Sequence, residues 1–482
     1  MKLSQLLENI EFTGSYTDCE VSLVTDNSKK VIKNCVFVCI EGAHFDGHTV
    51  AAQALANGAA AVVCQRDTGA ENQILVKNTR AAYTLLCSAF FGNPEKKLKL
   101  IGVTGTNGKT TTCFILKEIL EHFGKKTGLV GTVKNMVAQR EYPAALTTPD
   151  AYDLFSLFSE MAAEGCEYCV MEVSSQALDQ KRVEGVRFAA AIFTNLTRDH
   201  LDYHGSLENY RAAKRVLFDN ADIAVVNIDD EAAEYMLRGL TCRTATFSAK
   251  SDSCDYTAKN IRIKPDGVKY ELVGNGFIGR VKFAVPGMFS VYNSMGAAVC
   301  AAELGFDLGG VLEGLSLCRG VPGRMEVVPT QTDYTVIIDY AHSPDGLESL
   351  LECVNSLSDG RVITVFGCGG DRDKTKRPLM GKIACELSDI AVITSDNPRS
   401  EKPESIIDDI LAGAEGKAES VVIPSRREAI AAALGMARAG DVVVLAGKGH
   451  ETYQILNSGK IHFDEREEVA EYFSNRNEDN GD

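Results

Sequence analysis

Tryptophan is absent from this sequence, proline is scarce, and basic side chains are outnumbered by acidic ones. The 482 residues include 12 prolines, 50 Lys and Arg, and 66 Asp and Glu, which leaves a formal net charge of −16. Such a chain cannot neutralise a row of nucleic-acid phosphates by bulk charge, so we expect no nucleic-acid partner. We expect small-molecule partners instead, with any phosphate held by a few local cations or a metal ion.

Long hydrophobic runs and paired cysteine motifs are also missing. No apolar run approaches the roughly 20 residues of a membrane helix, and residues 1–12 lack the basic start of a secretory signal. The 15 cysteines are scattered, mostly through apolar segments, where thiols behave as small hydrophobes. Cys166 and Cys169 are the single close pair, and no second pair completes a zinc site. We therefore expect a protein of the reducing cytoplasm with no membrane partner.

The rest of the composition is typical of a globular protein with about three domains of roughly 150 residues. Breaks rich in Gly, Pro and charge fall at 91–97 and 319–324. We expect an α/β fold with three domains. These are a small N-terminal α/β domain (1–97), a central P-loop-type α/β domain (98–323) and a C-terminal Rossmann-like α/β domain (324–482).

Two patterns refine the expected domains. Residues 253–285 alternate polar and apolar side chains around two turn pairs, which predicts a β-hairpin excursion within the central domain. The C-terminal domain carries five Val- and Ile-rich runs at crossover spacing, typical of a parallel sheet covered on both faces. These runs are 336–338, 362–366, 390–394, 421–423 and 442–446.

A glycine-rich turn follows the predicted strand 98–103, and a helix is predicted from Cys113 onward. Backbone N–H groups and the helix dipole hold phosphates at such a turn. Lys109 would reach the terminal phosphates, and the Thr110 hydroxyl would reach magnesium. Val103 replaces the first glycine of the general motif, and a mere connection is the alternative, but the Gly-Lys-Thr in this context favours nucleotide binding. The turn residues expected to bind ATP are Gly105, Thr106, Asn107, Gly108, Lys109, Thr110 and Thr111.

A carboxylate is expected at the end of a neighbouring strand. The predicted strand 168–173 is apolar until Glu172. Such a side chain would hold magnesium directly or through water. By itself the signal is common, since many strands end in Glu.

Six motifs occur in order along nearly the whole chain: TGTNGKTT (104–111), MEVSS (171–175), TNLTRDHLDYHG (194–205), PGRME (322–326), DYAHSPD (339–345) and GCGGDRDKTKRPLM (367–380). Together they resemble those of the Mur ligases, the ATP-dependent amide-forming enzymes that build the peptide of bacterial peptidoglycan. The similarity is greatest to the members that add the third residue of that peptide. The resemblance implies roles in cell-wall biogenesis, cell shape and cell division.

The resemblance also implies a mechanism. ATP phosphorylates a substrate carboxylate, an amine attacks the acyl phosphate, and metal and local cations stabilise the crowded negative charge. Thr110, Glu172, His200 and Lys214, the last as a carbamate, would surround Mg²⁺. A polar loop rim for His200 and an unmodified lysine are the alternatives. The expected catalytic residues are Lys109, Glu172, His200, Lys214, Arg324, Asp339 and His342, and Asn293, Arg324 and Asp339 would also contact ATP.

The UDP-sugar substrate would lie between the first two domains. Ser28 sits in Asp-Asn-Ser-Lys-Lys, which departs from the family's usual Asp-Ser-Arg by an apparent insertion, and Ser290 replaces an asparagine that usually precedes Asn293. Without the family context, a turn or cap is the ordinary reading of the isolated Ser and Thr residues. The residues implied for this substrate are Ser28, His44, Thr147, Thr148, Ser174, Gln180 and Arg182.

The incoming amino acid should bind where the strands of the third domain end, because ligands of parallel open sheets lie beyond the carboxyl ends of the strands. An arginine fork suits the distal carboxylate of meso-diaminopimelate, and a glutamate suits its ammonium. L-Lysine lacks that carboxylate, so we predict diaminopimelate; a solvated arginine after an Asn-Pro turn is the alternative. The expected residues are Arg372, Asp396, Asn397, Pro398, Arg399, Gly447 and Glu451.

These patterns lead to one hypothesis. We expect a monomeric, Mg²⁺-dependent ligase that uses ATP to join meso-diaminopimelate to UDP-N-acetylmuramoyl-L-alanyl-D-glutamate. The nearest rivals are a lysine-adding or dipeptide-adding member, or a folylpolyglutamate synthetase. A nucleotide-binding regulatory protein without turnover would be expected to lose Lys109, Glu172, His200 or Lys214, and all four are present.

Overall fold

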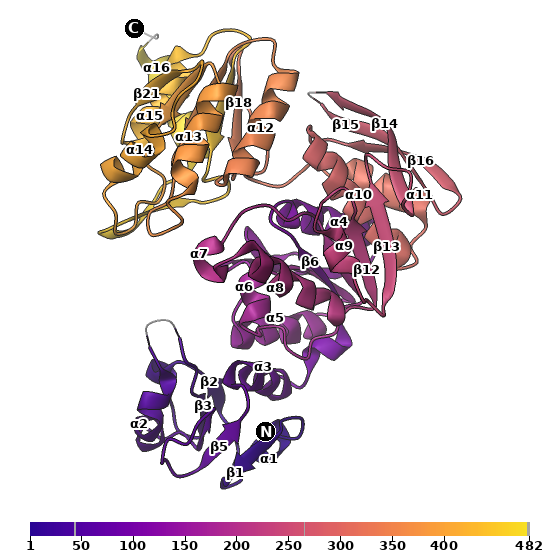
Figure 1. Ribbon diagram of the computed structural model, residues 1–482, viewed down its shortest axis with the longest axis vertical. Coiled ribbons are helices and arrows are strands. Elements are labelled where there is room, and N and C mark those ends of the chain that lie inside the picture. The colour runs from indigo at the N-terminus through magenta and orange to yellow at the C-terminus, as the bar shows by residue number, and fades with distance from the viewer. Residues whose placement is uncertain (43–44, 265, 480–482) are drawn as a thin grey trace.

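The computed structural model describes residues 1–42, 45–264 and 266–479. Three large sheets follow one another along the chain, each accompanied by helices (Figure 1). The predicted α/β class with three domains is therefore confirmed. No helix among the described residues is long and apolar enough to cross a membrane.

The N-terminal sheet has five strands in the order β1-β5-β4-β3-β2, with β1 antiparallel to β5 and the other neighbours parallel. The apolar runs 36–40, 60–64 and 73–76 predict β3, β4 and β5. The strands β1 and β2 are short and partly exposed, so no clear apolar run marks them in the sequence. The elements are α1 (Leu3–Leu6), β1 (Phe12–Gly14), β2 (Leu23–Thr25), β3 (Cys35–Val38), α2 (Ala51–Ala56), β4 (Ala61–Cys64), β5 (Gln73–Val76) and α3 (Thr79–Phe90), with 3-10 helices at Ser28–Lys30, Gly47–Val50 and Pro94–Lys97.

The central sheet has eleven strands in the order β16-β15-β14-β13-β12-β11-β6-β10-β7-β8-β9. The stretch predicted as a hairpin excursion forms three antiparallel strands, β14–β16, which continue this sheet through a parallel pairing of β14 with β13. The strands are β6 (Lys99–Thr104), β7 (Thr127–Val130), β8 (Lys134–Val137), β9 (Arg140–Pro143), β10 (Tyr168–Glu172), β11 (Ala190–Phe193), β12 (Ile223–Asn227), β13 (Arg243–Ser248), β14 (Tyr256–Lys264), β15 (Gly267–Gly274) and β16 (Phe277–Phe283). The helices are α4 (Lys109–His122), α5 (Ala151–Ala163), α6 (Ser175–Asp179), α7 (Leu201–His204), α8 (Leu207–Asp219), α9 (Ala233–Leu237), α10 (Met288–Glu303) and α11 (Leu308–Leu317).

The C-terminal sheet has six strands in the order β17-β18-β22-β19-β20-β21. The five strands predicted from apolar runs are all parallel, and the antiparallel β17 extends the edge beside β18. The elements are β17 (Glu326–Val328), β18 (Thr335–Asp339), α12 (Pro344–Leu357), β19 (Val362–Phe366), α13 (Lys376–Leu387), β20 (Ile390–Ile393), α14 (Pro403–Leu411), β21 (Glu419–Val422), α15 (Arg426–Met436), β22 (Val442–Ala446), β23 (Tyr453–Leu456), β24 (Gly459–His462) and α16 (Glu465–Asp479).

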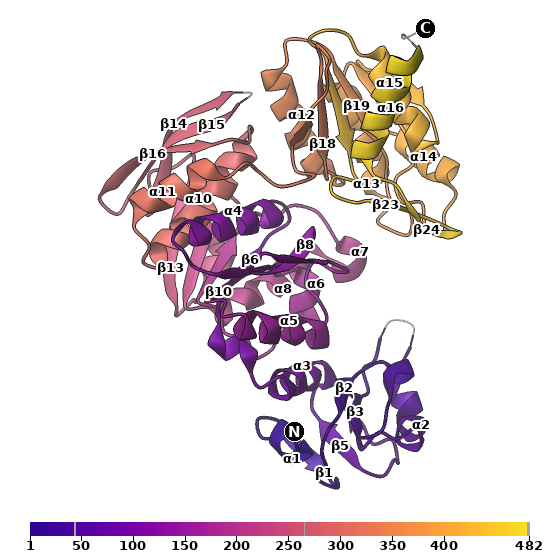
Figure 2. The ribbon, with the colours of Figure 1, turned by 180° about the vertical axis from the view of Figure 1, so that it is seen from behind.

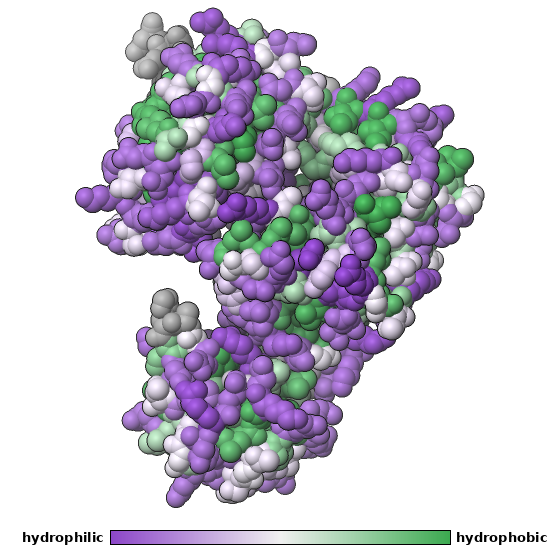
Figure 3. Space-filling model, in the orientation of Figure 1, coloured by the Kyte–Doolittle hydropathy of each residue, from purple (hydrophilic) through white to green (hydrophobic). Residues whose placement is uncertain are grey.

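Neighbouring residues of β6 point to opposite faces of the central sheet and enter two different hydrophobic cores. Ile101 packs in a core that continues into the C-terminal sheet through residues such as Phe366, whereas Leu100 packs in one shared with the N-terminal sheet through residues such as Val36. Figure 2 shows the three sheets as successive lobes, and Figure 3 shows the surface hollowed between the two outer lobes. The two faces of the central sheet thus belong to two different cores, each shared with one of its neighbours.

Candidate functional site

The phosphate loop leads from β6 directly into α4. The helix begins at Lys109 rather than near Cys113 as predicted, so Lys109 and Thr110 belong to its first turn. Gly108 has φ +85°, and a Cβ there would lie 2.3 Å from the Asn293 side-chain oxygen. Because only glycine fits that approach, the loop can bring its N–H groups to a phosphate at the helix N-terminus.

A half-buried lysine, Lys109, and a buried one, Lys214, meet at one backbone carbonyl of this loop. Lys109 Nζ donates to Gly105 O at 2.9 Å, and Lys214 Nζ, from α8, donates to the same oxygen at 2.8 Å. Burial lowers the pKa of Lys109. Burial and the nearby Lys109 lower the pKa of Lys214 well below its ordinary value. At any given pH Lys214 therefore has a larger neutral fraction than an ordinary lysine, and the neutral amine is the nucleophilic form.

Glu172 ends β10 beside the phosphate loop. Its Oε2 accepts from Thr110 Oγ1 at 3.0 Å, while Thr132 donates its N–H to Oε1 at 2.8 Å and its hydroxyl to Oε2 at 3.0 Å. Thr132 follows β7, and strand-end reasoning applied to that strand could have found it. A carboxylate with adjoining hydroxyls is the oxygen donor set that Mg²⁺ prefers, so Thr110 and Glu172 fit such an ion.

For the remaining predicted metal ligands, His200 and Lys214, no contact with this pair is found among the described residues. His200 has φ +53° and contacts Asp199, with its Nε2 3.5 Å from Asp199 Oδ2. Within the described residues, no group of three or more His, Cys, Asp or Glu side chains is arranged to hold a metal ion. The structure therefore brings together Thr110 and Glu172, while Lys214 contacts the loop at Gly105 O.

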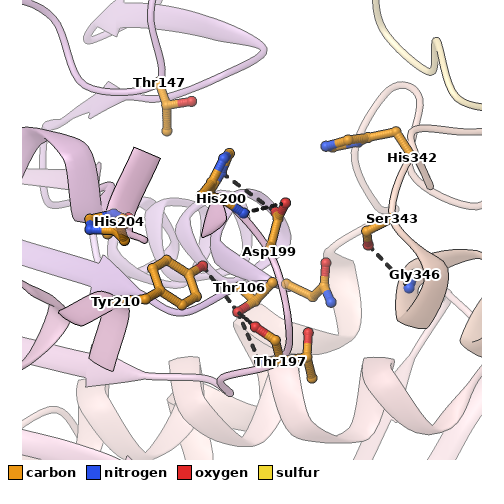
Figure 4. Close-up of polar contacts among 12 residues, drawn as sticks. Thr106, Thr147, Thr197, Asp199, His200, His204, Tyr210, His342, Ser343 and Gly346 are labelled. Carbon is orange, nitrogen blue, oxygen red and sulfur yellow. Dashed lines mark hydrogen bonds and ion pairs between the residues drawn. The ribbon is translucent and has the colours of Figure 1, made fainter. Parts of the chain in front are cut away.

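Asp199 belongs to a quoted motif but was not singled out from the sequence. Figure 4 shows its carboxylate between His200 and His342, the latter reaching over from the C-terminal sheet. Burial alone would raise the pKa of Asp199, but His200, His342 and Lys376 outweigh it and the pKa is lowered. Asp199 is thus an anion held among three basic groups from two lobes.

Tyr210 and two residues of the 194–205 motif, Asn195 and Thr197, hold the phosphate loop in place. Thr106 Oγ1 lies 3.1 Å from Tyr210 Oη and accepts from the Thr197 N–H at 3.0 Å, as Figure 4 shows. Asn107 donates its N–H to the Asn195 side chain at 2.8 Å. These contacts fix the loop from the side of β11.

A cavity of about 630 Å³ joins this loop to the C-terminal lobe. It is lined by the loop residues Asn107, Gly108, Thr110 and Thr111, and by Asn293, Arg324, Asp339 and His342. Arg324 Nη2 lies 3.2 Å from Thr110 Oγ1, and the guanidinium stacks 4.5 Å from the centre of the Tyr340 ring. The predicted nucleotide residues of two lobes therefore face one cavity.

Asp339 and His342 follow β18 at the rim of this cavity. Asp339 accepts the N–H groups of Met325 at 2.6 Å and Ala341 at 2.7 Å, and burial raises its pKa. His342 Nδ1 lies 2.8 Å from Tyr340 O, and burial together with Lys376 lowers its pKa to about 4. His342 is accordingly a neutral hydrogen-bonding group near pH 7.

The residues of the central lobe implied for the UDP-sugar form one hydrogen-bond network next to Glu172. Thr148 Oγ1 donates to Glu172 O at 2.8 Å, and Arg182 donates to Thr148 O at 2.7 Å and to the Gln180 side chain at 2.8 Å. Ser174 caps α6 by accepting from the Ala177 N–H. Thr147 Oγ1 lies 3.1 Å from Thr132 Oγ1, which links the network to Thr132 and Glu172.

The two N-terminal residues of that set are placed differently. Ser28 opens a 3-10 helix whose cap is Asn27, and no contact is recorded between Ser28 and the Thr148 network within the described part of the chain. His44 lies outside the described residues. Burial and the nearby Asp150 raise the pKa of Asp26, so the end of β2 does face the central lobe.

The residues expected to hold the amino acid converge at the ends of β19, β20 and β22. Asn397 Nδ2 donates to Glu451 Oε2 at 2.9 Å. Arg399 Nη1 donates to Gly370 O at 2.8 Å, and burial and the neighbouring Arg372 lower its pKa. Among the described residues Arg399 has no carboxylate in ion-pair contact, which leaves its guanidinium available to a ligand.

The same strand ends carry further predicted residues and one that the sequence did not predict. A Cβ at Gly447 would lie 2.7 Å from Asp396 Oδ2, so a side chain there would intrude on the buried Asp396 carboxylate. Pro398 is buried in the connecting turn. Lys448 is fully buried, and its Nζ lies 2.8 Å from Glu451 Oε2 and 3.3 Å from Asn397 Oδ1. No motif or residue spacing in the sequence marks Lys448 as a residue of this site.

Three family models match consecutive parts of the chain. They describe the Mur ligase family catalytic domain at residues 20–89, the Mur ligase middle domain at 103–301 and the Mur ligase glutamate ligase domain at 323–449. Together they match well over half of the sequence. The chain belongs to the Mur ligase family.

Named relatives agree over nearly the full length of this Mur ligase. It is 45% identical over 481 residues to the UDP-N-acetylmuramoyl-L-alanyl-D-glutamate–2,6-diaminopimelate ligase of Clostridium perfringens, covering 97% of this chain and 99% of the relative. It is 44% identical to that of Clostridium tetani, covering 98% and 99%. A solved structure of such a ligase superimposes with a TM-score of 0.69 at 33% identity, covering 95% of each chain.

A more distant structure supports the fold alone. The MurF ligase of Thermotoga maritima in complex with ADP has a TM-score of 0.64 at 21% identity, covering 95% of this chain and 98% of that one. The fold of this chain is therefore also found in that structure.

Proposed function

We propose that this chain is an ATP-dependent ligase that joins meso-2,6-diaminopimelate to the D-glutamyl γ-carboxylate of UDP-N-acetylmuramoyl-L-alanyl-D-glutamate, releasing ADP and phosphate in peptidoglycan precursor synthesis. The observation that carries the proposal is the 3.2 Å approach of Arg324 Nη2 to Thr110 Oγ1 across one cavity. Both residues line this cavity, so a nucleotide bound in it would contact both lobes. The relatives named for this reaction cover nearly all of the chain.

The phosphates of ATP would be held by the start of α4 and by cations. The N–H groups of the loop and the helix dipole favour a polyphosphate at Gly108, and Lys109 would leave its carbonyl partners for the terminal phosphate. Arg324 would face the same oxygens. In the reaction, the carboxylate oxygen attacks the γ-phosphorus, and ADP leaves with the electron pair of the broken bond. These fixed positive groups stabilise the charge that builds up as that bond breaks.

Mg²⁺ would be held by Thr110 and Glu172. When bound it would supply charge neutralisation between the terminal phosphates. His200 would complete the set after a rearrangement that separates it from Asp199, and Lys214 would contribute as a carbamate. Support for the carbamate comes from burial and from Lys109, which keep a neutral fraction of Lys214 available to add to CO₂ with loss of one proton.

The two organic substrates would approach from opposite lobes. The Thr148 network adjoins Glu172 and suits the muramyl peptide, whose D-glutamyl carboxylate must reach the γ-phosphate. At the ends of β19, β20 and β22, Arg399 and Arg372 suit the distal carboxylate of diaminopimelate, and Asp396 and Glu451 suit its distal ammonium. The other amine attacks the acyl phosphate, loses a proton, and phosphate leaves as the amide forms.

Each lobe would therefore have one task. We assign UDP-sugar recognition to residues 1–97, ATP chemistry to 98–323 and amino-acid capture to 324–482. We further propose that the ligase acts as a cytoplasmic monomer.

Phosphate release in the presence of a panel of UDP-muramyl precursors and amino acids tests the proposal. Release is expected with the dipeptide precursor, meso-diaminopimelate, ATP and Mg²⁺ together, and not when Mg²⁺ is chelated. Release with the tripeptide precursor instead of the dipeptide, or equal efficiency with L-lysine, would contradict it.

A further inference from the structure

The outer face of β14–β16 carries a cluster of basic side chains that the ligase reaction does not use. Residues directly opposite on neighbouring antiparallel strands share a face, and Arg262 pairs with Lys269, which pairs with Lys282. The three cations therefore form one row across three strands. Lys264 and Arg280 lie two residues from this row on β14 and β16, on the same face. We call these five residues, Arg262, Lys264, Lys269, Arg280 and Lys282, the basic face.

The basic face is solvent-facing because helices cover the other side of the three strands. Val268, Tyr270 and Val281 point into the core, where α10 and α11 pack. Arg262, Lys264, Arg280 and Lys282 are exposed. Figures 1 and 2 show β14–β16 at the far edge of the central sheet, away from the N-terminal lobe.

Local electrostatics work against this arrangement. Like charges directly opposite on a sheet are destabilising. Among the described residues, Lys269 has one ion pair, to Asp266 at 3.5 Å, and the other four cations have none. Glu271, a carboxylate on this face, lies opposite Arg280 in the register and accepts from Asn260 at 2.6 Å. A chain with a net charge of −16 thus places four cations that form no ion pair within the described residues on one face of a sheet.

Protection of the sheet edge does not account for the pattern. Lysines on an edge strand hinder pairing with other chains, and this reason applies to Lys282 because β16 is the edge. The same reason applies to Arg262, because β14 pairs with β13 only at Tyr256 and Thr257. Lys269 lies on β15, which is paired on both sides, so its placement needs another explanation.

We propose that the basic face is a docking surface for an extended acidic segment of a partner protein. Its side chains border a groove of about 590 Å³, formed by Arg262, Lys269, Glu271, Arg280 and Lys282. Along one strand the cations recur at every second residue, about 7 Å apart, which is the spacing of alternate side chains in an extended segment. Carboxylates at alternate positions of such a segment would meet Arg280 and Lys282 on β16, or Arg262 and Lys264 on β14. The groove favours a single chain over a flat bilayer.

Binding of two labelled acidic peptides of equal composition tests this docking surface. In one peptide glutamate alternates with threonine; in the other the glutamates form one block. Fluorescence anisotropy on the full-length ligase is expected to give tighter binding of the alternating peptide. The Lys269→Glu/Lys282→Glu variant should lose at least about tenfold in affinity. Lys382→Glu/Lys417→Glu is the control, with the same change in net charge on the C-terminal lobe, and should bind as wild type.

Two further measurements keep the test independent of folding and of the proposed reaction. Ligase activity should be unchanged in all variants, and Lys269→Gln/Lys282→Gln provides a milder substitution. Lys269→Glu alone should raise the urea midpoint of unfolding, because it removes like-charge contacts. Equal binding of the two peptides, tighter binding of anionic vesicles or of oligothymidylate, or unchanged affinity in the Lys269→Glu/Lys282→Glu variant would overturn the proposal.

Discussion

At the scale of single residues, burial determines what the charged groups of this ligase can do. Lys214 and Lys109 lie against the same carbonyl, and their mutual repulsion adds to burial in lowering the pKa of Lys214. An ordinary surface lysine is protonated at neutral pH and does not react with CO₂. The position therefore makes Lys214 suited to modification.

Lys214→Ala is expected to lower kcat by about 100-fold, because one charge-stabilising group at the phosphates is lost. Wild-type activity in degassed buffer should rise on addition of bicarbonate, and that of the variant should not. Phosphate release measures both. Lys125→Ala, at an exposed lysine of the same lobe, is the control. A bicarbonate response that persists in Lys214→Ala would contradict the carbamate.

Arg399→Ala should raise the KM for meso-diaminopimelate by roughly 10- to 100-fold, since a hydrogen bond to a charged group contributes about 1.5–3 kcal/mol. The preference over L-lysine should fall by a similar factor, because lysine has no distal carboxylate to lose. Competition between the two amino acids measures it. Arg427→Ala, at an exposed arginine of the same lobe, should leave the preference unchanged. An unaltered preference in Arg399→Ala would refute the assignment.

Lys448 acts through its neighbours rather than on the substrate. Its ammonium fixes the carboxylate of Glu451 and the amide of Asn397. Lys448→Met should raise the KM for diaminopimelate at least about tenfold, with the KM for ATP unchanged, and Lys448→Arg should restore part of the loss. Steady-state kinetics with each substrate varied in turn measures the split. A parallel rise in both constants would indicate general loss of structure instead.

At the scale of elements, the start of α4 and the middle of α10 constrain each other. The approach of Gly108 to Asn293 links the phosphate loop to a helix about 180 residues later in the sequence. The side chain of Asn293 therefore restricts the conformation of the loop, in addition to any contact it makes with a nucleotide.

Gly108→Ala is expected to raise the KM for ATP at least about tenfold. The added Cβ would clash with Asn293, and a left-handed residue other than glycine costs about 1–2 kcal/mol. Gly124→Ala is a matched control because Gly124 also has positive φ, at +71°, but has no atom within 4 Å of the added Cβ. Adding Asn293→Ala to Gly108→Ala should relieve the steric part. Equal ATP kinetics in the two single variants would contradict this reasoning.

At the scale of the whole molecule, neutral histidines lie where the C-terminal and central lobes meet. Burial and Lys376 hold the pKa of His342 at about 4, and burial, Arg324 and Arg466 hold that of His450 at about 3. Both values lie below the roughly 6.5 of an unfolded chain. The unfolded state therefore binds more protons between these values, and stability must decrease as the pH drops through that range.

The free energy of unfolding contributed by His342 should be fully present above about pH 6.5 and should fall as the pH drops toward 4. Thermal unfolding from pH 7.5 to 4.5 measures it. His342→Asn keeps a donor near Tyr340 O and cannot be protonated, so its loss of stability over this range should be smaller than that of wild type. His462→Asn, at an exposed histidine, is the control. An identical pH dependence in wild type and His342→Asn would refute the prediction.

Short sequence motifs determined the local chemistry of this protein. The phosphate loop, the carboxylate at the end of β10 and the Asp-Asn-Pro-Arg turn each depend on residues a few positions apart, and strand-to-helix spacing is a local property. The apolar runs likewise predicted the five parallel strands of the C-terminal sheet. The hairpin at 253–285 was predicted only in part, because alternation within a segment does not reveal which strand it will extend.

Only the tertiary structure decided which distant side chains meet. The contacts of Thr132 with Glu172, Arg324 with Thr110 and Lys448 with Asn397 join residues 40, 214 and 51 positions apart. Such contacts depend on the order of strands in a sheet and on how the lobes pack. The row Arg262, Lys269 and Lys282 depends in the same way on the register of three strands, since a shift of one residue would send every side chain to the other face.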